Sequence, residues 1–212
     1  MNATAPGPRQ DDIRANLFIA PFGSIGAVIL ADSLRRILAE GLDVGQLVWI
    51  GLAILTVVVG PLSVRLPLSN CKVSFSDVSI FLSLLAFGPH LAIATGALDG
   101  FAASTRRGGV WYKTVFNTSG LAISVCLSSQ VFTRLLPDGR LHGPGLSAFD
   151  LVLPAMAFVL VQYLVNTALV STVVTLKDHV PLASTWLRAS PWSGMACIAG
   201  SVAAAVVFLV IR

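Results

Sequence analysis

Charged residues are scarce in this sequence. Asp, Glu, Lys and Arg make up 11% of the 212 residues, whereas hydrophobic residues make up 55%. A soluble domain usually contains about 25% charged residues. The composition therefore excludes a folded soluble domain and predicts an all-α fold, a polytopic transmembrane helical bundle. The net charge of +4 is typical of basic loops at a membrane surface, and we expect no nucleic acid partner.

The motifs of soluble enzymes are also missing. The sequence contains no G-x-x-x-x-G-K-[ST], H-E-x-x-H, G-x-S-x-G or C-x-x-C. The three histidines share no common spacing, and the three cysteines lie far apart, so neither set predicts a metal site or a disulfide. We therefore expect no enzymatic activity, no catalytic residues, no metal and no cofactor.

Two short apolar segments at 75–104, which meet at Gly88-Pro89, form the most specific part of the sequence. Proline is tolerated in the first turn of a helix and disrupts a helix interior, so this step predicts the end of one helix and the start of the next. Helices of roughly 20–24 Å are short for a bilayer core of about 30 Å, so the pair either spans a locally thin region or forms a re-entrant hairpin. We predict a short helical hairpin, with close packing at the G-x-x-x-G step of Gly96 and Gly100.

Longer hydrophobic runs complete a predicted bundle of about seven hydrophobic helices. Residues 1–16 are expected to form a disordered polar tail, and residues 17–212 a single integral membrane domain. Residues 177–190 are predicted to be a short amphipathic piece at the membrane interface. The predicted helices outside the hairpin cover residues 17–38, 44–64, 114–136, 149–176 and 191–211.

Basic residues predict how the bundle is oriented. Of the 14 Lys and Arg residues, nine fall on the side of the N-terminus. The five on the opposite side are Arg35, Arg36, Arg134, Arg140 and Arg212. Because basic residues are enriched in cytoplasmic loops, the N-terminus is expected in the cytoplasm and the C-terminus outside. The expected location is the inner (plasma) membrane, with the lipid bilayer as a partner.

Polar side chains inside the predicted helices are the candidates for a ligand-binding or sensing site. They are Asp77, Asp99, Asn117, Gln162 and Asn166, all in the half of the bundle nearer the N-terminal side. Such groups are costly in a membrane and often mark a ligand or proton pathway. Structural roles are the alternative: Asp77 as a helix cap, Asp99 paired with the basic loop that follows, and the amides as links between helices.

The chain resembles a bacterial membrane module. The order of V-R-L-P, V-S-F-S, F-N and N-T-A-L, in residues 62–104, 116–124 and 164–171, resembles the MASE-type membrane-associated sensor modules found upstream of GGDEF or HD-GYP output domains. The resemblance covers roughly residues 15–210. It implies sensing of an unidentified signal that is passed to cyclic-di-GMP enzymes. Since no output domain follows Arg212, we expect a stand-alone or truncated module, with a protein partner or a second copy as its target.

A shorter resemblance gives an alternative function. The segment S-D-V-S-I-F-L-S-L-L-A-F-G-P, followed by G-A-L-D-G within residues 76–100, is similar to the substrate-binding S components of energy-coupling-factor transporters. In that family a G-P step joins two helices near the ligand. This similarity implies a small-molecule uptake subunit with a small-molecule ligand, and the sequence leaves both functions open.

Overall fold

The computed structural model describes residues 10–41, 44–59, 64–65, 72–73, 75–106, 110–137, 149–178, 181 and 186. Within these residues the chain is helical apart from a two-residue antiparallel pair, β1 (Val64–Arg65) and β2 (Lys72–Val73). The all-α prediction is therefore confirmed. The helices are α1 (Gln10–Glu40), α2 (Val44–Val59), α3 (Phe75–Phe87), α4 (Pro89–Arg106), α5 (Trp111–Leu135) and α6 (Val152–Asp178), the last preceded by a 3-10 turn, Phe149–Leu151.

The predicted hairpin is α3 and α4. Gly88 joins them with φ of 89°, a left-handed conformation that glycine adopts without strain. The Gly88 N–H donates to the Leu84 carbonyl at 3.1 Å, and the Ala92 N–H donates to the Gly88 carbonyl at 3.2 Å. Gly88 therefore ends α3 and opens α4, and Pro89 takes the first helical position as predicted.

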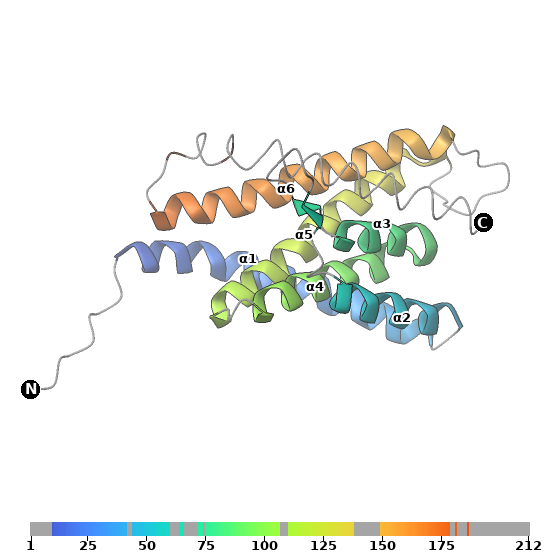
Figure 1. Ribbon diagram of the computed structural model, residues 1–212, viewed down its shortest axis with the longest axis horizontal. Coiled ribbons are helices and arrows are strands. Elements are labelled where there is room, and N and C mark those ends of the chain that lie inside the picture. The colour runs from blue at the N-terminus through green and yellow to red at the C-terminus, as the bar shows by residue number, and fades with distance from the viewer. Residues whose placement is uncertain are drawn as a thin grey trace, which may run out of the picture.

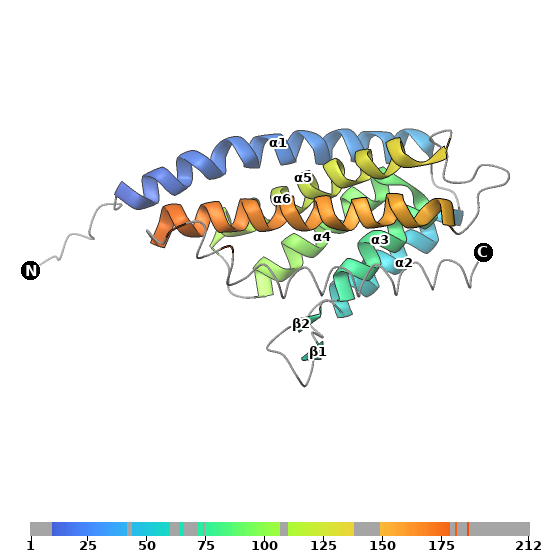
Figure 2. The ribbon, with the colours of Figure 1, turned by 90° about the horizontal axis from the view of Figure 1, so that it is seen from above.

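Helix α5 runs through the middle of the bundle and packs against α1, α4 and α6 (Figures 1 and 2). Glycines allow its neighbours to approach closely. A Cβ atom at Gly100 of α4 would lie 2.6 Å from the Asn117 carbonyl oxygen, and one at Gly96 would lie 2.9 Å from a Val125 methyl group. The predicted close approach at Gly96 and Gly100 is therefore confirmed, and its partner is α5.

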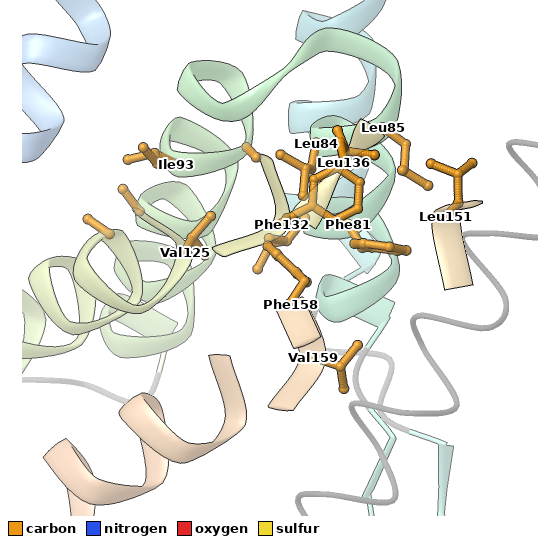
Figure 3. Close-up of a cluster of buried hydrophobic side chains, with 14 residues drawn as sticks. Phe81, Leu84, Leu85, Ile93, Val125, Phe132, Leu136, Leu151, Phe158 and Val159 are labelled. Atoms are coloured by element: carbon orange, nitrogen blue, oxygen red, sulfur yellow. The ribbon is translucent and has the colours of Figure 1, made fainter. Parts of the chain in front are cut away.

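Three phenylalanine rings form the centre of the hydrophobic core (Figure 3). Phe81 of α3 lies 5.1 Å from Phe158 of α6, measured between ring centroids, and 6.1 Å from Phe132 of α5 in an edge-to-face arrangement. Such pairs add about 0.5–1.5 kcal/mol beyond the burial of their area. This cluster fastens the α3–α4 hairpin to α5 and α6.

Many large apolar side chains are exposed on the outside of the bundle, and several hydroxyl groups lie inside it beside the hydrophobic core. Ser83, Thr95, Ser124 and Ser128 are completely buried. Two described helices, α5 and the segment Phe149–Leu176, are long and apolar enough to cross a membrane. The exposed large hydrophobic residues include Val44, Leu47, Val48, Ile54, Leu55 and Val58 on α2, and Leu153, Met156 and Leu160 on α6.

Some predicted boundaries need correction. Helix α1 begins at Gln10 rather than at 17, so residues 10–16 of the predicted tail are helical, and Pro21 lies inside the helix. Acidic residues such as Asp11 and Asp12 are favourable in a first helical turn, whereas hydrophobicity alone places the start too late. Helix α2 ends at Val59, before the predicted 64.

The described residues contain six α-helices, which correspond to six of the seven predicted. The predicted helix at 191–211 lies outside the described residues, as do residues 1–9 of the tail. Of the predicted interfacial piece at 177–190, only 177, 178, 181 and 186 are described, and the first two belong to α6.

Candidate functional site

The five predicted site residues are distributed over four helices. Asp77 is on α3, Asp99 on α4, Asn117 on α5, and Gln162 and Asn166 are one turn apart on α6. Gln162 is buried, and the other four side chains are half-buried. The site residues therefore come from helices that pack around α5, rather than from one continuous segment.

Asn117 connects α5 to α4. Its Nδ2 group donates to the Ser104 hydroxyl at 2.7 Å, and that hydroxyl donates to the Gly100 carbonyl at 2.9 Å. The bond lies beside the closest approach of the two helices, where Gly100 faces the Asn117 backbone. Because the amide of Asn117 links two helices, this residue fits the structural alternative.

The two carboxylates lie at different places in the hairpin. Asp77 is in the first turn of α3, where a negative charge interacts favourably with the helix N-terminus. Asp99 is half-buried on α4, next to Gly100. Arg106, one of its predicted partners, donates through Nη2 to the Val57 carbonyl in the last turn of α2. Arg106 therefore fastens α2 to α4.

A buried hydrogen-bonded node, formed by Trp49, Ser83 and Thr95, was missed from the sequence. Trp49 Nε1 of α2 lies 2.9 Å from Thr95 Oγ1 of α4, and Ser83 Oγ of α3 lies 3.0 Å from the same oxygen. The Thr95 hydroxyl donates its only hydrogen to the Leu91 carbonyl at 2.9 Å. Trp49 and Ser83 must therefore both donate to Thr95, so this hydroxyl joins three helices and its hydrogen-bonding capacity is filled.

A pattern of polar and small residues along one face of α2 could have indicated this hydrogen-bonded node from the sequence. Gln46, Trp49, Ala53 and Thr56 follow the spacing of one helix face. Gln46 Nε2 donates to the Ile37 carbonyl of α1 at 3.2 Å, and the Thr56 hydroxyl donates to the Leu52 carbonyl at 2.8 Å. Polar and small residues thus face the bundle, while the apolar residues of α2 face outward.

On α6 a similar link lies beside Asn166. Trp186 Nε1 donates to Thr167 Oγ1 at 3.2 Å, and the Thr167 hydroxyl donates to the Tyr163 carbonyl at 2.6 Å. Within the part of the chain that the structure describes, no group of three or more His, Cys, Asp or Glu residues is placed to hold a metal ion. The hydrogen bonds that join one described helix to another include those of Gln46, Trp49, Arg106 and Asn117.

No protein-family model, curated protein or solved structure matches this chain. The resemblances to MASE-type sensor modules and to transporter S components stay predictions from the motifs of the sequence.

Proposed function

We propose that this chain is a multi-pass bundle of about seven helices in the bacterial inner membrane, with its N-terminus in the cytoplasm. It works as a sensor-like or partner-binding module of signalling and has no catalytic activity of its own. The observation that carries the membrane assignment is that every exposed side chain on the described part of α2 is apolar, while α5 and the segment Phe149–Leu176 are long and apolar enough to cross a membrane. Soluble monomers rarely expose large apolar patches.

The contacts between helices are of the kind that works in lipid. Lipid tails are as apolar as leucine, so helices in a membrane gain little from burying apolar side chains against one another. They associate through close packing and hydrogen bonds instead. Gly26, Gly96 and Gly100 supply close packing against α5. The Thr95 node and the Asn117–Ser104 bond supply hydrogen bonds.

The hydrogen bonds of Asn117 and Thr95 favour a partner-binding module over an uptake subunit. Asn117 donates to Ser104. The Thr95 hydroxyl already makes hydrogen bonds with Leu91, Trp49 and Ser83, so it has no capacity left for a ligand. A substrate-binding subunit needs polar groups that turn toward a ligand. The same groups here hold α2, α3, α4 and α5 together, so the changes that they can report are changes in helix packing.

Membrane extraction tests the first part of the proposal. In bacterial cells expressing the chain, the protein should stay in the membrane pellet after an alkaline carbonate wash and should dissolve only in detergent. Release into the carbonate supernatant would overturn the assignment. A reporter fused after Arg212 should be active outside the cytoplasm, and cytoplasmic activity would contradict the seven-span arrangement.

Native mass spectrometry tests the choice between the two functions. Protein extracted in a mild detergent should give the mass of the chain, or a multiple of it, with lipid as its only small-molecule adduct. A stoichiometric non-lipid compound that disappears in Asp99→Asn would show a small-molecule site at Asp99, which favours the uptake subunit and overturns a module that binds only a protein partner.

A further inference from the structure

Helix α2 presents different chemistry on its two faces. Its buried residues are Gln46, Ala53 and Thr56, and Trp49 is half-buried beside them. None of these is a large aliphatic side chain. Its exposed residues are apolar, and a Cβ atom at Gly51 would have nothing within 4 Å. Since apolar contact gives little net attraction in lipid, α2 is held in place by other means.

Hydrogen bonds connect α2 to the bundle at three levels. Gln46 reaches the Ile37 carbonyl near the start of α2, Trp49 reaches Thr95 on its inner face, and Arg106 reaches the Val57 carbonyl near its end. The described part of α2 packs against α3 and α4. Figure 1 shows it at the edge of the bundle, on the opposite side from α6.

Helix α2 is attached to the bundle by fewer means than the α3–α4 hairpin. Among the described residues, no side chain of α2 belongs to either hydrophobic core cluster, and Gly41, which ends α1 with φ of 79°, is exposed with nothing within 4 Å of an added Cβ. The hairpin, by contrast, is fixed to α5 and α6 through Phe81 and Gly100. A displacement of α2 would therefore leave the contacts of the hairpin with α5 and α6 in place.

We propose that α2 is a latched, movable helix and that the bond from Trp49 Nε1 to Thr95 Oγ1 is its latch. This inference rests on the proposed function, because release of α2 is the packing change by which the module passes on its signal. When the latch opens, Thr95 keeps its bonds to Leu91 and Ser83, so the buried hydroxyl stays hydrogen-bonded. Gln46 and Arg106 still hold the two ends of α2, so the latched and released states differ by the Trp49 bond at the middle of the helix, a small difference of the kind that lets two states be populated.

Hydrogen–deuterium exchange of the full chain in lipid nanodiscs tests the latch. Thr95→Val keeps the shape of the side chain and removes the acceptor of Trp49. Exchange within α2 should become about three- to tenfold faster, the range expected from one interhelical hydrogen bond in a membrane, while α5 and α6 stay unchanged. Thr172→Val is the matched control, because the Thr172 hydroxyl donates to the Ala168 carbonyl of its own helix at 2.8 Å. The control should leave α2 exchange unchanged.

Trp49→Phe removes the same bond from the other side and keeps an aromatic ring. It should accelerate α2 exchange to the same extent, and the double variant should exchange no faster than either single one. If Thr95→Val does not fold, Trp49→Phe decides the test alone. Unchanged α2 exchange, or equal acceleration in all helices, would overturn the latch. In a protein that passes the carbonate and reporter tests, that result leaves the proposed function standing.

Discussion

The two sides of the α3–α4 hairpin are packed by different means. Toward α5 and α6, the hairpin uses phenylalanine rings and glycines, with a Cβ at Gly100 only 2.6 Å from a backbone oxygen. Toward α2, it uses hydrogen bonds from Trp49 to Thr95 and from Arg106 to the Val57 carbonyl. Displacing a closely packed helix disturbs many contacts at once, whereas losing one hydrogen bond costs about 1 kcal/mol. The contact of the hairpin with α5 and α6 is therefore the firmer one, and its contact with α2 is the one that we propose to be releasable.

Gly100→Leu should have the largest effect, because the added side chain meets the backbone of Asn117, which cannot move without shifting α5. We expect a loss of about 3 kcal/mol or more in unfolding free energy, measured by thermal unfolding in detergent. Gly51→Leu, placed in open space on α2, should unfold like the wild type. Equal stability of the two variants would contradict the close-packed seam.

Phe132→Ala should cause the second-largest loss in unfolding free energy. Its ring is completely buried against Phe81 and Phe158, and its removal leaves a cavity costing about 3 kcal/mol. Phe149→Ala is the control, since Phe149 is exposed and its truncation leaves no cavity. The same detergent unfolding measurement applies, and a loss in the control as large as that in Phe132→Ala would show that the phenylalanine cluster is not the fastening point.

Asn117→Ala should have a smaller effect. It removes the donor to Ser104, but the Ser104 hydroxyl keeps its own bond to the Gly100 carbonyl. We expect a loss of about 1 kcal/mol in the unfolding measurement. Gln130→Ala is the control on the same helix, because Gln130 is an exposed amide that bonds within α5. A loss above that of Phe132→Ala would mean that Asn117 does more than link two helices.

Asp99→Asn should change stability least, by about 1 kcal/mol or less, because the amide keeps the shape and hydrogen-bonding capacity of the carboxyl. Asparagine does not ionise, so if Asp99 is the proposed sensing group, the variant should lose the pH dependence of the unfolding temperature that this carboxylate confers. Unfolding in detergent across pH measures this, with Asp150→Asn as the control. Identical pH profiles for wild type and Asp99→Asn would remove Asp99 as a proton-sensing residue.

Local rules predicted the hairpin well. The bounds of α3 agree with the prediction to the residue, and Gly88 and Pro89 act as the G-P step indicates. The close approach at Gly96 and Gly100 was also predictable, because small residues at that spacing imply a neighbouring helix. The sequence did not show that the helix packed against these glycines is α5. Nothing in the residues around Val125 and Asn117 indicates that they contact Gly96 and Gly100.

The candidate site was less predictable. Asn117 was selected as a polar residue in an apolar run, and the structure gives it a partner, Ser104, 13 residues earlier. Trp49 and Thr95 were not selected as site residues, because tryptophan and threonine are common in apolar helices. The two residues are also 46 positions apart, so their sequence spacing does not suggest a contact. Sequence periodicity shows on which face of a helix a residue lies. Its hydrogen-bond partner, however, depends on how helices that are distant in the sequence pack against one another.

The lengths of the helices have a consequence for the surrounding membrane. At 1.5 Å per residue, α1, α5 and α6 are each roughly 37–47 Å long, whereas α2, α3 and α4 are each roughly 20–27 Å. In the proposed membrane arrangement, α5 and α6 are long enough for a bilayer core of about 30 Å, whereas α2, α3 and α4 are shorter than it. Lipid beside α2 should then thin locally, at a cost that grows with each ångström of mismatch. Under the proposed arrangement, a change in bilayer thickness would therefore act on α2.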